Sequence, residues 1–238
     1  MNASVNGTAA QQKLGGMAAL YLAAAYLVAI PYFLVFAKYP SVVGPAEKVA
    51  WLVSHHSSMR VMYLITYIIF GIVLAVLVLT LYERLKAGAS MMSKAAAVAG
   101  LVWAVALVAS GMIFNAGVAA VVELNATSPA QAVAVWQNVE PIALGLGGGN
   151  GELLGGLWLL LISLTAMRIG ALPTALNWLG GAIGIAGVLS VVPALRSMAY
   201  AFGLLQIVWF VWLGVVMLRT TSRPAEAAVS PGSARRPE

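Results

Sequence analysis

The sequence predicts an all-α fold: a polytopic integral membrane bundle of six transmembrane helices with both termini in the cytoplasm. Composition is the first observation, since hydrophobic residues make up 62% of the 238 residues and charged residues only 8%. Soluble domains carry roughly 25% charged residues. Segment length is the second, because apolar runs of about 20 residues can cross a bilayer core about 30 Å thick. Six such helices use nearly the whole chain and leave no room for a second domain.

Six apolar segments form the predicted transmembrane domain, which covers residues 14–218. They lie at 14–37, 61–82, 95–122, 150–167, 178–192 and 199–218. The first run is longer than the apolar core of a signal peptide, about 7 to 15 residues, so we expect it to remain as a membrane helix. Pro31 lies inside this run and predicts a kink. Gly180 and Gly184 form a small-residue stripe on the fifth segment, which predicts close packing on another helix.

Both ends of the chain are predicted to be disordered tails. Residues 1–13 are rich in small and polar residues and show no apolar period. Residues 219–238 contain three prolines, many small residues and no apolar face. Neither segment can bury enough apolar surface to offset the entropy of ordering it.

Two connections on the predicted outer side each indicate a short helix lying at the membrane interface. In 38–60, Pro45 suits a first helical turn and is followed by the apolar Val49 and Trp51. In 123–141 the sequence Thr-Ser-Pro suits a helix cap and first turn, and we expect that helix to end near Trp136.

The distribution of basic residues predicts the orientation. Nine Lys and Arg fall in the tails and connections assigned to the cytoplasm and four fall outside, as the positive-inside rule requires. The inner set is Lys13, Arg84, Lys86, Lys94, Arg168, Arg219, Arg223, Arg235 and Arg236, and the outer set is Lys38, Lys48, Arg60 and Arg196. Because these charges flank apolar segments and form no block, the net charge of +6 indicates topology and no nucleic-acid partner.

The residue inventory restricts the chemistry. The chain has no Cys, and its seven acidic residues are all Glu, with only two His beside them. Disulfides and thiolate metal sites are therefore excluded, and we expect no cofactor and no metal site. An intramembrane enzyme would depend on Glu alone, so a catalytic function is less favoured than a non-catalytic one, although the residues leave the question open.

Several segments carry a family resemblance. They are GMAALYL at 16–22, LYERLK at 81–86, and GLWLLL at 156–161 followed by Gly-Ala-Leu-Pro at 170–173. The chain resembles, over residues 14–218, the bacterial membrane family catalogued as domain of unknown function 4386. This resemblance implies a six-helix, multi-pass protein of the bacterial cytoplasmic (inner) membrane, without an assigned activity.

Four polar residues are the candidate ligand-binding residues. Glu152 precedes Arg168 by about 24 Å of helix rise, and similar estimates place Asn115 and Gln206 in the outer half of the membrane, with Asn150 beside Glu152. A polar group in hydrocarbon is costly unless it faces a partner or a cavity. The pattern predicts an outward-facing polar pocket, formed by the third, fourth and sixth helices, that binds or transports a small molecule or ion.

Other interpretations remain open. Glu152 could lie at the interface beside water with Asn150 capping its helix. The chain would then be a non-catalytic accessory or structural subunit, with another membrane protein or a second copy of itself as partner besides the lipid bilayer. His55 and His56 suggest, more weakly, a copper site with nearby methionines or a sensor of acid.

Overall fold

The computed structural model describes residues 2–147 and 152–221, and the side chains of 9–147 and 152–219. Within these ranges the fold is all-helical and contains no strand, which confirms the prediction of an all-α chain. In chain order the elements are α1 (Asn2–Pro31), the π-helical η1 (Tyr32–Phe36), the 3-10 turn η2 (Tyr39–Ser41), α2 (Pro45–Tyr63), the π-helical η3 (Leu64–Ile69), α3 (Phe70–Leu85), α4 (Ser90–Thr127), α5 (Pro129–Gly147), α6 (Leu153–Ile169), α7 (Thr174–Leu189), the 3-10 turn η4 (Pro193–Leu195) and α8 (Met198–Thr221).

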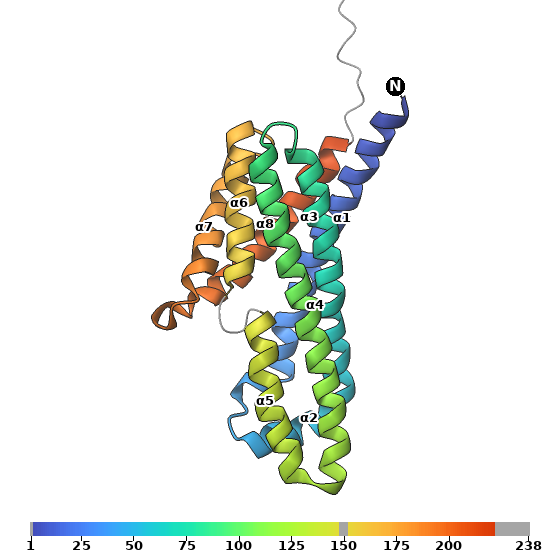
Figure 1. Ribbon diagram of the computed structural model, residues 1–238, viewed down its shortest axis with the longest axis vertical. Helices are drawn as coiled ribbons and strands as arrows, with labels where there is room; N and C mark the ends of the chain where they lie inside the picture. The colour runs from blue at the N-terminus through green and yellow to red at the C-terminus, as the bar shows by residue number, and fades with distance from the viewer. Residues whose placement is uncertain (1, 148–151, 222–238) are drawn as a thin grey trace, which may run out of the picture.

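The helices form two parts, each with its own hydrophobic core (Figure 1). The bundle consists of α1, α3, the first half of α4, α6, α7 and α8, around a core that includes Leu77, Trp158 and Phe210. The projecting lobe consists of η2, α2, the second half of α4 and α5, around a core that includes Leu52 and Trp136. Figure 1 shows this lobe extending beyond the lower ends of α6, α7 and α8.

Two long helical rods pass through both parts. The first runs without a break from Pro45 to Leu85 through α2, η3 and α3, over 41 residues. The second is α4, with 38 residues. At about 1.5 Å per residue each rod is about 55 to 60 Å long, roughly twice the thickness of a bilayer core. The lobe is therefore held to the bundle by continuous helices.

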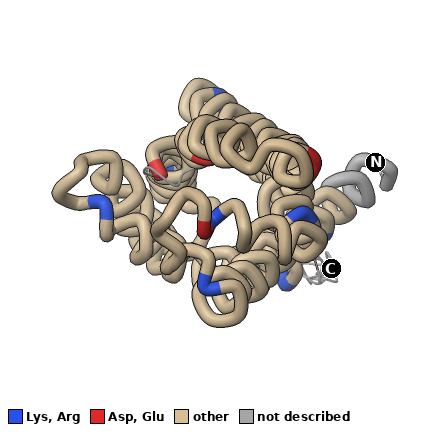
Figure 2. Tube along the Cα trace, turned by 90° about the horizontal axis from the view of Figure 1, so that it is seen from below, with Lys and Arg blue, Asp and Glu red and all other residues tan. Residues whose placement is uncertain are grey.

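Four described helices are long and apolar enough to cross a membrane: Ala9–Phe36, Pro45–Leu85, Ser90–Thr127 and Met198–Arg219. The helices α6 and α7 are apolar but shorter, with 17 and 16 residues. Large apolar side chains also cover the outside of the molecule, and charged positions are sparse when it is viewed along its long axis (Figure 2). These lengths and surfaces are those of a membrane protein.

The structure differs from the tail predicted for residues 1–13, because residues 2–13 are helical and continue α1. The physical reason is local. Alanine, glutamine and lysine at 9–13 are good helix formers, and extending an existing helix avoids the cost of nucleation. The Gln12 side chain also accepts a hydrogen bond from Arg84 Nη1 at 2.7 Å, which fixes this turn beside the end of α3.

The two predicted interfacial helices are also corrected. The segment from Pro45 continues into α3 as one rod, and α5 does not end near Trp136 but runs to Gly147. The apolar residues that suggested contact with a membrane surface are buried against protein instead: Val49 is 2% exposed and Trp136 is 1% exposed. They belong, with residues of the second half of α4, to the core of the lobe.

Close helix packing in the bundle depends on glycine. A Cβ on Gly156 would lie 2.7 Å from the carbonyl oxygen of Gly184, so α6 and α7 approach with their backbones nearly in contact. Small residues such as glycine permit membrane helices to approach one another this closely.

Candidate functional site

A cavity of about 280 Å³ lies where the bundle meets the projecting lobe. Its wall combines residues of α1, η1, η3, α3, α4 and α8 with the end of α5 and Glu152. The wall is mainly apolar, and six of its described residues are aromatic: Tyr26, Phe33, Tyr67, Phe70, Trp103 and Tyr200.

Two π-helical segments place side chains in this wall. Pro31 lacks a backbone N–H, and the helix after it widens so that the Ala37 N–H donates to the Tyr32 carbonyl at 2.7 Å. The other segment, η3, is a π-helical stretch of the rod between α2 and α3. π-Helical turns of this kind are frequent at functional sites. Here they contribute Phe33 and Tyr67 to the cavity.

The aromatic residues of the wall hold one another in place. Tyr26 meets Phe70 edge to face, with ring centroids 5.4 Å apart, and Phe70 meets Trp103 at 6.4 Å. Tyr67 packs on Phe114 of the lobe at 5.5 Å. Edge-to-face pairs of this kind each contribute about 0.5 to 1.5 kcal/mol beyond the area that they bury. The paired rings of the wall therefore belong to two groups, since Tyr26, Phe70 and Trp103 pack within the bundle and Tyr67 packs on the lobe.

Glu152 is the one charged residue among the described residues of the wall. It is the N-cap residue of α6. Its backbone N–H donates to Ser190 Oγ at 2.9 Å, and its carbonyl accepts from the Gly156 N–H at 2.8 Å. Among the residues that the structure describes, its carboxylate has no hydrogen-bond or ion-pair partner. The backbone is thus fixed, while the carboxylate is left without a partner from the described residues.

The other predicted site residues lie elsewhere. Asn115 borders a separate hollow with His56 and Arg60. Gln206 is fully buried on α8, both of its amide atoms lack a hydrogen-bond partner in the described part of the chain, and it is not in the wall of the cavity. Asn150 lies outside the described residues. Residues at one depth can face different directions around their helices, so equal depth did not bring Glu152, Asn115 and Gln206 together.

Sequence reasoning missed the aromatic wall. A signal was present on the first helix, where Tyr26, Ala29, Ile30 and Phe33 follow the i, i+3, i+4, i+7 pattern of one helix face. All four line the cavity. An aromatic and small-residue stripe of this kind would have pointed to the first helix as a wall of the Glu152 pocket.

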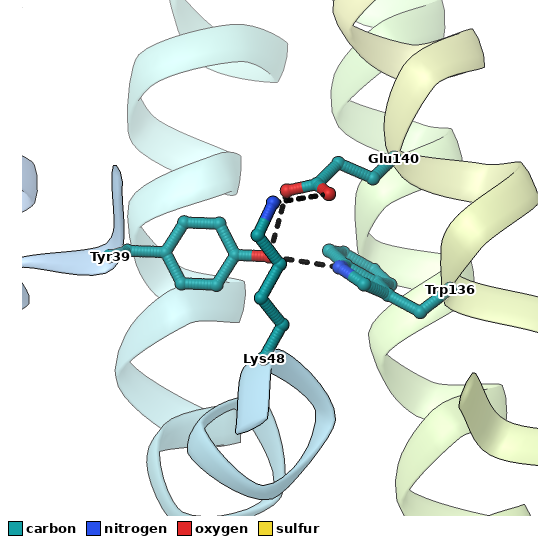
Figure 3. Close-up of polar contacts among 4 residues, drawn as sticks. All are labelled: Tyr39, Lys48, Trp136 and Glu140. Atoms are coloured by element: carbon teal, nitrogen blue, oxygen red, sulfur yellow. Dashed lines mark hydrogen bonds and ion pairs between the residues drawn. The ribbon is translucent and has the colours of Figure 1, made fainter. Parts of the chain in front are cut away.

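A second polar group, the Tyr39 cluster, consists of Tyr39, Lys48, Trp136 and Glu140 (Figure 3). The Tyr39 hydroxyl donates to Glu140 Oε1 at 2.9 Å and accepts from Trp136 Nε1 at 2.8 Å. Lys48 Nζ lies 2.7 Å from Glu140 Oε2. Burial raises the pKa of the Tyr39 hydroxyl above its usual range, and the adjacent Glu140 carboxylate raises it further. The cluster ties η2 and α2 to α5.

The histidines considered for copper have local partners. The His55 ring stacks on Trp51 with centroids 4.1 Å apart, and its Nδ1 lies 3.0 Å from the Trp51 carbonyl oxygen. His56 Nδ1 lies 2.9 Å from the Val53 carbonyl oxygen. In the described ranges no group of three or more His, Cys, Asp or Glu is placed to hold a metal ion.

Comparison with known proteins gives no relative from which a function could be transferred. No family model, no curated protein and no solved structure matches the chain. The features of the chain that bear on its function are therefore the cavity and its carboxylate.

Proposed function

We propose that the chain is a multi-pass protein of the bacterial cytoplasmic membrane that binds a small molecule in its outward-facing cavity, as part of binding or transport. The observation that carries this proposal is the position of Glu152. Its carboxylate borders a mainly apolar, aromatic cavity and has no protein partner among the described residues. A buried or half-buried charge is costly without a partner, so such a position favours a site for a ligand.

The proposed topology has six spans, with both termini in the cytoplasm and the projecting lobe outside. Basic residues support it: Arg84, Lys94, Arg168 and Arg219 lie at the ends of α3, α4, α6 and α8 that are remote from the lobe. Arg84 also donates to the carbonyl oxygen of Ala171 at 3.0 Å, so the end of α3 is joined to the connection between α6 and α7. The helices α6 and α7, about 25 Å long, would cross as short spans with local thinning of the bilayer. Membership of the family of unknown function 4386 belongs to the same proposal.

A labelling experiment tests the orientation. Because the chain contains no Cys, a single cysteine can be introduced without removing others. Ala29→Cys places a thiol in the cavity wall, and Lys86→Cys places one in the exposed end of α3 remote from the lobe. We expect a membrane-impermeant maleimide added to intact cells to label Ala29→Cys, and to label Lys86→Cys only after permeabilisation. The reverse pattern would refute the proposed topology.

Ligand binding is tested on the same Ala29→Cys protein in detergent. Three aromatic probes of similar size are compared for their ability to slow labelling: benzyltrimethylammonium, benzyl alcohol and benzenesulfonate. Protection by any of the three supports a small-molecule site. An unreactive thiol, or a reactive thiol that none of the probes protects, would remove the support for binding and favour an accessory or structural subunit.

A further inference from the structure

We infer that the cavity is selective for organic cations, with the positive group of the ligand beside Glu152 and its apolar part against the aromatic wall. This inference rests on the proposed function and specifies the ligand class of the same site. An alkyl or aryl ammonium compound is the chemistry that the residues of the wall fit.

The ionisable residues of the cavity favour a cation. Among the fourteen described residues that line the cavity, Glu152 is the acidic one and no Lys, Arg or His is present. A cationic ligand would pair with the carboxylate in mainly apolar surroundings, and an anion would be repelled there. The Coulomb energy of such a pair rises as the local dielectric constant falls.

The aromatic residues of the wall also favour a cation. Tyr26, Phe70 and Trp103 form connected aromatic pairs within the wall, and Tyr67 lies in the same wall. Aromatic faces attract ammonium groups, with Trp the strongest partner, and aromatic cages suit quaternary ammonium ions. A neutral apolar ligand would use the same rings but would leave Glu152 without a partner.

The residue set also argues against an inorganic cation. Calcium requires six to eight oxygen ligands, and transition metals require several imidazole, thiolate or carboxylate ligands. The described wall offers one carboxylate, with the hydroxyls of Thr66 and three tyrosines as its other side-chain oxygens. The volume of about 280 Å³ is near the lower end of the range for small-molecule sites, so a compact organic ion fits better than a long lipid chain.

The experiment measures protection of Ala29→Cys by benzyltrimethylammonium in purified protein, with benzyl alcohol and benzenesulfonate as the neutral and anionic comparisons. We expect the cation to protect at concentrations at least about tenfold lower than benzyl alcohol, and benzenesulfonate to give no protection. This comparison needs no change at Glu152, so it holds even if a Glu152 variant folds poorly.

Variants then test whether the preference for the cation depends on Glu152. Glu152→Gln in the Ala29→Cys background should weaken protection by the cation at least about tenfold and leave protection by benzyl alcohol unchanged. Glu123→Gln is the matched control, because it removes an exposed carboxylate from α4 outside the cavity, and it should leave both values unchanged. Phe33→Leu should weaken cation binding by about twofold to thirtyfold, the range expected for one cation–π contact.

The outcomes separate the two proposals. If benzyl alcohol or benzenesulfonate protects as well as the cation, or if Glu152→Gln binds the cation as tightly as the parent protein, the cation inference is overturned while the small-molecule site stands. If the introduced thiol of the Ala29→Cys protein is reactive and none of the three probes protects it, the proposed function fails and the inference fails with it.

Discussion

Lys48 and Glu140, 92 residues apart in the sequence, form an ion pair with Nζ and Oε2 2.7 Å apart. Their side chains are only 24% and 15% exposed. The pair joins α2 to α5, and through Tyr39 it also holds the segment that follows the first helix. Because α5 and that segment both lead into the cavity wall, the Tyr39 cluster holds together the parts of the lobe that continue into the site.

Removing one partner of this pair should destabilise the protein. Lys48→Met leaves the Glu140 carboxylate half-buried without its cation, and we expect a loss of about 1 to 3 kcal/mol in the free energy of unfolding. Thermal unfolding in detergent measures it. The matched control is Lys86→Met, which breaks the more exposed pair with Glu83 and should not shift the midpoint measurably. Equal midpoints for Lys48→Met and the parent protein would contradict a stabilising role.

Stability should also fall at alkaline pH because of Tyr39. Its pKa is raised in the folded state, whereas in the unfolded chain a tyrosine titrates near a pKa of about 10. Above about pH 10 the unfolded state therefore releases the proton while the folded state keeps it, so the contribution of Tyr39 is complete below about pH 10 and decreases as the pH rises beyond it.

Tyr39→Phe provides the comparison for this pH effect. The variant should unfold at lower temperature than the parent at about pH 8, because it loses the hydrogen bonds with Glu140 and Trp136. The difference in midpoint should narrow between about pH 10 and about pH 12. A difference that stays constant over this range would show that the Tyr39 hydroxyl is not protected from ionisation by folding.

Two glycines of α7, Gly181 and Gly184, should change the stability of the protein in opposite directions when each is replaced by alanine. A Cβ on Gly184 would lie 2.8 Å from the carbonyl oxygen of Gly156, so Gly184→Ala must force α6 and α7 apart, at a cost of about 1 to 3 kcal/mol. A Cβ on Gly181 meets nothing within 4 Å. Gly181→Ala should therefore stabilise the helix by up to about 1 kcal/mol. Unfolding midpoints compared in one detergent test both, and similar shifts for the two variants would disprove the close contact.

Gly170 ends α6 with a φ of +66°. A Cβ there meets no neighbouring atom, so any cost of substitution comes from backbone strain alone. Gly170→Ala should destabilise the protein by about 1 kcal/mol, and Gly170→Asn should cost less because asparagine tolerates this conformation better. The order Gly, Asn, Ala in thermal midpoint is the expected result, and an alanine variant as stable as the parent would contradict it.

The sequence was most informative where apolar length alone determines an element. The runs predicted at 95–122 and 199–218 correspond to α4 (Ser90–Thr127) and α8 (Met198–Thr221), to within about five residues at each end. In such segments every backbone group must be paired internally, so composition is enough to predict a helix. The glycines of the fifth segment were likewise predicted to serve helix packing, and Gly184 does so.

The sequence was least informative between the spans. Val49 and Trp136 are apolar residues on short helices, and their pattern is the same whether the apolar face meets lipid or another helix. The pattern therefore predicted two interfacial helices where the structure has a packed lobe. The helix that contains the second predicted span begins earlier than that span, because after Pro45 no further proline interrupts the rod that runs to Leu85.

What the sequence by itself determined is the class of molecule: a helical chain whose long apolar segments suit a bilayer, with Glu152 identified as a charge at the start of a helix. Only the tertiary structure decided what surrounds that charge. The aromatic wall draws its residues from several helices, and the Tyr39 cluster joins residues as far as 101 positions apart. The direction in which each side chain faces depends on how the helices rotate and cross, which is set by the packing of all of them together and is not contained in the depth or spacing of any one.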